Sequence, residues 1–111
     1  MLTIFACPRP FKGIFDVIQK NAVRSWKLLH PRVEIILFGD EEGTAQVARQ
    51  LGIRHEAEIL RNEYGTPLVN DLFKRAEHLS TYELLAYVNA DIILLSDFLT
   101  AIKKVIDLSL I

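Results

Sequence analysis

The stretch Ala86-Tyr87-Val88-Asn89-Ala90-Asp91-Ile92-Ile93-Leu94-Leu95 organises the interpretation of the whole chain. It continues an apolar run over residues 84–88, and five or more consecutive apolar residues are typical of a strand buried on both faces of a parallel sheet. Asn89 and Asp91 then interrupt the apolar residues. A carboxylate there is costly to bury unless a cation or donors serve it, and open α/β sheets bind ligands at the carboxyl ends of their strands. The stretch therefore predicts a binding site at a strand end.

Apolar patterning along the rest of the chain predicts a regular alternation of strands and helices. Buried strands are expected over residues 2–7, 33–38 and 84–88, and a short edge-type strand over 53–60. Helices are expected over residues 14–29, 42–51, 66–79 and 96–106. This alternation implies a three-layer α/β domain with a mainly parallel, Rossmann-like sheet and helices on both faces.

Individual residues indicate where the helices start and which side faces the core. Thr66 followed by Pro67 predicts a capped start for the third helix, and Ser96 a cap for the fourth. Ile14 opens the apolar stripe of the first helix and Ala45 that of the second.

Composition narrows the class of protein. At 111 residues, half of them hydrophobic, the chain is expected to form one domain over residues 1–111 with a substantial core. A net charge of −1 argues against nucleic-acid binding, and no apolar run approaches the length of a membrane span. A single cysteine and the lack of a positively charged leader favour the cytoplasm.

Three loops are expected to converge at the carboxyl edge of the sheet. They contain Cys7-Pro8-Arg9-Pro10-Phe11, Gly39-Asp40 and Asn89-Ala90-Asp91. Neither G-x-G-x-x-G nor G-x-x-x-x-G-K-[ST] occurs, so neither a dinucleotide fingerprint nor a P-loop is supported. Each loop also has a plainer interpretation. Asn89 and Asp91 suit a strand-ending turn, Asp40 suits a turn or helix cap, Arg9 suits a solvated surface and Cys7 suits a core position.

The arrangement resembles the nucleotide-binding half of GT-A glycosyltransferases, the nucleotide-diphospho-sugar transferase fold. Tyr87-Val88-Asn89-Ala90-Asp91 is similar to the family's hydrophobic-hydrophobic-D-x-D motif. The resemblance implies a strand order of 3-2-1-4 and a nucleotide-diphospho-sugar as ligand. It also implies that the loop from Cys7 through Pro8 and Arg9 to Phe11, together with Asp40, contacts the nucleoside, and that Asn62 and Asn70 contact the diphosphate or sugar.

The resemblance further implies a divalent cation, Mn²⁺ or Mg²⁺, held by Asp91. Asn89 stands where the family usually has its first aspartate, so this position keeps an oxygen ligand but brings no charge. A cation that bridges a diphosphate takes few ligands from the protein, because the phosphates supply others.

A glycosyltransferase-like function is thus the first hypothesis, and sugar-nucleotide recognition is expected more firmly than turnover, because the chain covers only about the first half of a typical family member. Two alternatives belong to other classes. One is a non-enzymatic interaction module that forms homo-oligomers through an exposed fourth strand or an apolar helix face. The other is a generic nucleotide binder without sugar chemistry.

Overall fold

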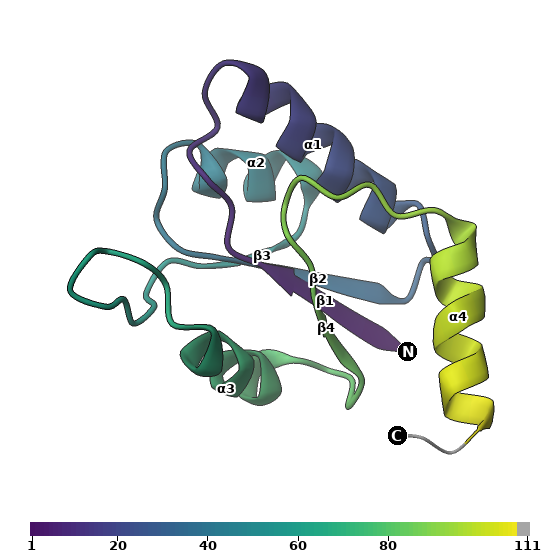
Figure 1. Cartoon of the computed structure of the whole chain (residues 1–111). Helices are drawn as coiled ribbons and strands as arrows, with labels where there is room; N and C mark the ends of the chain where they lie inside the picture. Colours follow the sequence, from purple (N-terminus) through teal and green to yellow (C-terminus); the bar gives the residue numbers. More distant parts are fainter. Residues whose placement is uncertain (109–111) are drawn as a thin grey trace.

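A computed structural model describes residues 1–108, in which strands and helices alternate as the sequence predicts (Figure 1). The strands are β1 (Leu2–Ala6), β2 (Val33–Phe38), β3 (Arg54–Glu56) and β4 (Leu85–Tyr87). The helices are α1 (Ile14–Lys27), α2 (Thr44–Leu51), α3 (Val69–Leu79) and α4 (Ser96–Asp107).

The four strands form one parallel sheet in the order β3-β2-β1-β4. The apolar runs of β1 and β2 lie at its centre, and every residue of β1 is buried. The chain winds from β1 through β2 to β3, and then returns across the sheet to place β4 on the other side of β1. The predicted α/β class and the predicted strand order are both confirmed.

The sheet is covered on both faces, which gives the three layers (Figure 1). Helices α1 and α2 cover one face, where Trp26, Val23 and Ala48 pack against alternate residues of β1 and β2. Helix α3 covers the other face, where Leu72 and Ala76 pack against Phe5 and its neighbours in β2. Since side chains alternate along a strand, both faces of β1 and β2 are filled and the centre of the sheet is fixed in place.

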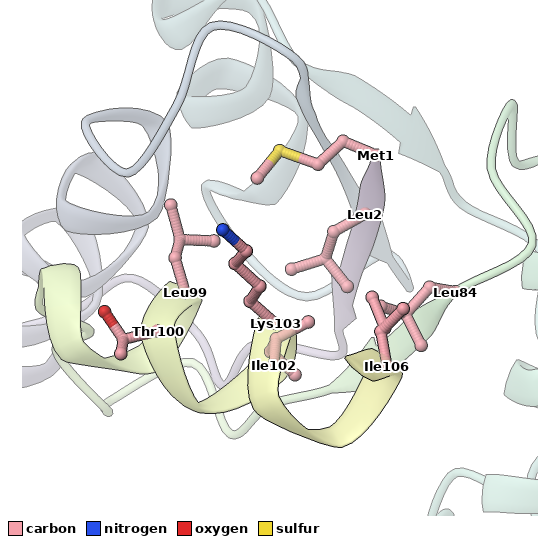
Figure 2. Close-up of a pocket in the computed structure, with 8 residues that line it drawn as sticks. All are labelled: Met1, Leu2, Leu84, Leu99, Thr100, Ile102, Lys103 and Ile106. Carbon is pink, nitrogen blue, oxygen red and sulfur yellow. The ribbon is translucent and has the colours of Figure 1, made fainter. Parts of the chain in front are cut away.

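Helix α4 lies beside the amino ends of β1 and β4, apart from the three layers (Figure 1). Phe98 and Leu99 pack partly against the core, yet no residue of Ser96–Asp107 is fully buried. An apolar groove of about 340 Å³ separates α4 from the sheet, and Figure 2 shows its lining. The lining residues are Met1, Leu2, Leu84, Leu99, Thr100, Ile102, Lys103 and Ile106.

Two strand predictions were wrong in extent or burial. β4 lies at the edge of the sheet and its residues are only half-buried, so the apolar run over 84–88 does not mark a strand covered on both faces. The strand expected over 53–60 is limited to Arg54–Glu56. Beyond it, the backbone turns into a hairpin-like loop, in which Arg61 and Pro67 form an isolated antiparallel bridge.

The predicted helix starts were also wrong in detail. Thr66 is held within the β3–α3 loop, where its carbonyl accepts from the Asn62 N–H. Thr66 and Pro67 therefore precede α3 instead of starting it. Ser96 is the first residue of α4 and its side chain makes no cap bond. Ile14 and Ala45 are exposed because α1 and α2 turn other residues toward the sheet, including Gln19 on α1 and Val47 on α2.

Candidate functional site

The loops after β1 and β4 meet where the chain reverses direction across the sheet. β1 pairs with β2 on one side and with β4 on the other, so its carboxyl end marks the point at which the connections diverge. A cavity of about 150 Å³ lies there. Its lining consists of Arg9, Phe15, Gln19, Asn89, Ala90 and Asp91. We call it the switch-point cavity. It brings together three predicted site residues, namely Arg9, Asn89 and Asp91.

Arg9 provides the positive charge of the switch-point cavity. Its guanidinium carbon lies 5.1 Å from the centre of the Phe15 ring, a cation–π contact that directs the side chain toward the start of α1. Its backbone is held by the buried amide of Gln19, which accepts from the Arg9 N–H at 2.8 Å and donates to the Arg9 carbonyl at 2.9 Å. The guanidinium therefore extends from a fixed stretch of backbone.

Asn89 and Asp91 lie on an ordered turn that follows β4. The Val88 N–H donates to the Phe5 carbonyl, which continues the pairing with β1. The Ile92 N–H donates back to the Asn89 carbonyl at 3.1 Å and closes the turn. The side chains of Asn89 and Asp91 are exposed, while Ala90 between them is buried. The turn that sequence patterning offered as the plainer interpretation exists, and both Asn89 and Asp91 line the same cavity.

Asp40 lies in a separate cavity of about 410 Å³ beside the ends of β2 and β3. Arg61 is its principal neighbour: one guanidinium nitrogen lies 3.3 Å from Asp40 Oδ1 and 3.4 Å from Glu41 Oε1. The other donates to the Gly65 carbonyl at 2.9 Å. The Asp40 side chain remains 74% exposed, so its carboxylate is free to accept further hydrogen bonds.

Cys7 lies beneath this charged cluster. A side chain on Gly39 would meet its Sγ at 3.2 Å and a guanidinium nitrogen of Arg61 at 3.6 Å, which locates the thiol beside the end of β2. Burial raises the pKa of the Cys7 thiol, and although Arg61 opposes that effect, the net shift is upward. A protonated thiol is a poor nucleophile and a poor metal ligand, so the environment favours the core role for Cys7.

The other predicted site residues lie apart from the switch-point cavity. Phe11 is buried, and its N–H donates to the Glu42 carbonyl. Pro8 is buried as well. Asn62 uses its side-chain oxygen within its own loop, where it accepts from the backbone N–H groups of Tyr64 and Thr66. Asn70 is exposed in the first turn of α3.

The switch-point cavity contains few side chains that could bind the predicted Mg²⁺ or Mn²⁺. Among residues 1–108, no group of three or more His, Cys, Asp or Glu side chains could hold a metal ion by itself. The switch-point cavity offers one carboxylate, Asp91, and one amide oxygen, Asn89. Two hard oxygen donors fit a Mg²⁺ or Mn²⁺ that takes its remaining ligands from phosphates and water.

Sequence patterning missed Gln19, Phe15 and Arg61. Gln19 lies on the otherwise apolar buried face of α1. Its role is evident only from the tertiary structure, because its amide bonds to the backbone of the proline-rich loop after β1. Phe15 is set beside Arg9 by the turn at Gly13, which has a φ of 55°. Arg61 is 21 residues from Asp40, and only the fold of the β3–α3 loop pairs them.

Within the described part of the chain, no helix has the length and apolar character needed to cross a membrane. Comparison with family models, curated proteins and solved structures finds no match to this chain.

Proposed function

We propose that this chain binds a nucleotide-diphospho-sugar, together with Mg²⁺ or Mn²⁺, at the carboxyl edge of its sheet and serves glycosyl transfer. The observation that carries the proposal is the composition of the switch-point cavity: a cationic residue, Arg9, and an anionic residue, Asp91, line the same small space. A diphosphate with its bound cation carries both signs of charge and needs both kinds of partner.

The residues take separate roles in this proposal. Arg9 binds the diphosphate, and Asp91 holds the cation with help from the Asn89 amide oxygen. A divalent cation in such a site neutralises the charge that grows on the departing diphosphate during transfer. Asp40, in the separate cavity of about 410 Å³, accepts hydrogen bonds from the nucleoside. Asn62 and Asn70 do not line the switch-point cavity, and their contact with the diphosphate or sugar stays a prediction.

The remaining predicted residues shape the site without touching the diphosphate. Pro8 and Phe11 are buried and fix the course of the loop that carries Arg9. Cys7 fills the space beneath Gly39 at the end of β2. A rigid loop matters because a binding group that is already in place loses less conformational entropy when the ligand arrives.

Calorimetric titration tests the proposal directly. UDP-sugars and GDP-sugars are titrated into the chain with Mn²⁺ and with EDTA, and ATP and NAD serve as comparison ligands. We expect Mn²⁺-dependent binding that Asp91→Ala weakens by about tenfold or more. The matched control is Asp107→Ala, which removes an exposed carboxylate at the end of α4. Tighter binding of ATP or NAD would favour the generic nucleotide binder, and absence of binding to every nucleotide by the folded chain would refute the proposal.

A second candidate function is assembly with another copy of the same chain. The supporting observation is that α4 is rich in apolar residues, none of them fully buried, and flanks an apolar groove next to the edge strand β4. An edge strand can pair with its own copy about a two-fold axis. We expect the sedimentation mass to rise with concentration. Ile106→Asp, in the groove beside α4, should suppress that rise. Ile14→Asp, on the exposed surface of α1, should leave the rise unchanged. A mass that stays monomeric at all concentrations would exclude this candidate.

A further inference from the structure

One helix contacts both loops that line the switch-point cavity. Gln19, Ser25 and Trp26 all belong to α1, and each makes a side-chain hydrogen bond to the backbone of a cavity loop. Gln19 and Trp26 are seven residues apart, which is about 10 Å along a helix. The same rigid element therefore holds the loop after β1 and the loop after β4.

Gln19 holds the loop after β1 through both polar atoms of its amide. Gln19 is only 2% exposed, and a buried amide is costly unless its donor and its acceptor are both paired. Here the acceptor takes the Arg9 N–H and the donor reaches the Arg9 carbonyl. These two bonds fix the backbone of Arg9 and do not involve its guanidinium.

Ser25 and Trp26 hold the loop after β4. The Trp26 indole N–H donates to the Ile92 carbonyl at 2.8 Å, one residue beyond Asp91, and Trp26 is fully buried. The Leu94 N–H donates to Ser25 Oγ at 3.0 Å, and that hydroxyl in turn donates to the Ala22 carbonyl inside α1. Both ends of the connection that follows Asp91 are thus tied to the helix.

We propose that α1 is the positioning element of the switch-point cavity, and that Gln19, Ser25 and Trp26 set the separation between Arg9 and Asp91. The role of this separation in ligand binding rests on the function proposed above. In a diphosphate with its bound cation, the negative phosphates and the positive cation lie next to each other. Arg9, which meets the phosphates, and Asp91, which meets the cation, therefore have to be held at a matching separation. Loops that moved independently would bind such a ligand weakly, whereas loops attached to one helix move together.

Amide hydrogen exchange tests the hold on the loops without any ligand. The reporters are the Arg9 N–H, bonded to Gln19, and the Leu94 N–H, bonded to Ser25. We expect Gln19→Leu to accelerate exchange at Arg9 by about fivefold or more and to leave Leu94 unchanged, and Ser25→Ala to have the reverse effect. The matched control is Asn21→Leu, an amide-to-leucine change on the exposed side of α1. Unchanged exchange at both reporters would overturn the inference.

Binding of a nucleotide diphosphate with Mn²⁺ tests the positioning role itself. Gln19→Leu should weaken binding by about fivefold or more. Gln19→Glu should also weaken binding, because an ionised carboxylate still accepts from the Arg9 N–H but sets its second oxygen against the Arg9 carbonyl and adds negative charge to the cavity. Asn21→Leu should bind normally. A Gln19→Leu chain that exchanges faster at Arg9 yet binds as tightly as the natural chain would overturn the positioning role. If the natural chain binds no nucleotide, the proposed function fails, whereas the exchange measurements alone still decide whether α1 holds the loops.

Discussion

The carboxylate of Glu34 offers a stringent test of how the amino end of the sheet is held together. Its Oε1 accepts from Thr3 Oγ1 at 2.8 Å and from the Thr81 N–H at 2.8 Å, and its Oε2 accepts from Thr81 Oγ1 at 3.0 Å. One side chain on β2 therefore joins β1 to the loop that leads into β4. Replacement by alanine removes all three bonds.

The expected cost follows from the burial of the partners. Thr3 is fully buried, so Glu34→Ala leaves its hydroxyl without its acceptor in a site with no exposure to water. Loss of a bond to a charged acceptor costs about 1.5–3 kcal/mol, and the bonds from exposed Thr81 count for less. We expect the free energy of unfolding to fall by about 2–3 kcal/mol in Glu34→Ala. Glu34→Gln keeps an acceptor oxygen and should lose about 1 kcal/mol.

The same network makes stability depend on pH. Burial alone would raise the pKa of Glu34, but the hydrogen bonds from Thr81 and Thr3 outweigh it and hold that pKa below its usual value. Unfolding therefore returns the carboxyl to its ordinary pKa of about 4.3. The stabilisation is present above that value and is lost as the pH falls through the lower folded pKa. The difference in stability between the natural chain and Glu34→Gln should narrow on going from pH 7 to pH 3.5.

Urea unfolding followed by tryptophan fluorescence provides the assay, since Trp26 is the one tryptophan in the sequence and is fully buried. Glu83→Ala, an exposed glutamate near the same end of the sheet, is the control and should change stability by no more than about 0.5 kcal/mol. The reasoning is refuted if Glu34→Ala is as stable as the control, or if the gap between the natural chain and Glu34→Gln is the same at both pH values.

Three further predictions concern backbone and thiol. Gly43→Ala should lower the free energy of unfolding in urea by about 2 kcal/mol or more, because φ is +85° and a Cβ would lie 2.7 Å from Phe11 Cβ. Gly52→Ala, whose Cβ would meet no atom within 4 Å, should cost about 1 kcal/mol. Equal losses in the two variants would contradict this prediction. Asp71→Ala should speed proteolysis of the β3–α3 loop, because it removes the carboxylate that accepts the Leu60 N–H of that loop at 2.8 Å, and unchanged cleavage would count against the contact. Cys7 should react with iodoacetamide more slowly than a free thiol at pH 7.5, because burial raises its pKa, and a faster reaction would be inconsistent with that environment.

The fold could be predicted from the sequence because its strongest signals are local. The runs that became β1 and β2 are mostly apolar at consecutive positions, which is typical of a strand covered on both faces of a parallel sheet. The turn at Asn89 and Asp91, the plainer alternative to a binding site, was visible for the same reason, since polar residues that break an apolar run mark its end. These features depend on neighbours in the chain.

The rest depends on contacts between residues that are distant in sequence. The Thr66 N–H donates to the side-chain oxygen of Asn62, and this bond keeps Thr66 in the β3–α3 loop. The preference of threonine for helix caps gives no sign of this contact. Arg61 reaches Asp40 across 21 residues, so the predicted nucleoside contact also belongs to an ion-pair cluster. Gln19 is polar on a buried face because the Arg9 backbone needs a partner there. The candidate site is thus partly visible from strand-end residues, but the side chains that position it follow from the tertiary fold.

The central claim is that a nucleotide diphosphate and its cation bind at the switch-point cavity, and paramagnetic broadening by Mn²⁺ tests its location most directly. In the ¹H–¹⁵N spectrum of the chain with a UDP-sugar or GDP-sugar, Mn²⁺ should broaden the amides of Asn89, Ala90, Asp91 and Arg9 first. Asp91→Ala should abolish that pattern. Broadening centred on α4 or on the β3–α3 loop, or no nucleotide-dependent broadening at any amide, would contradict the account.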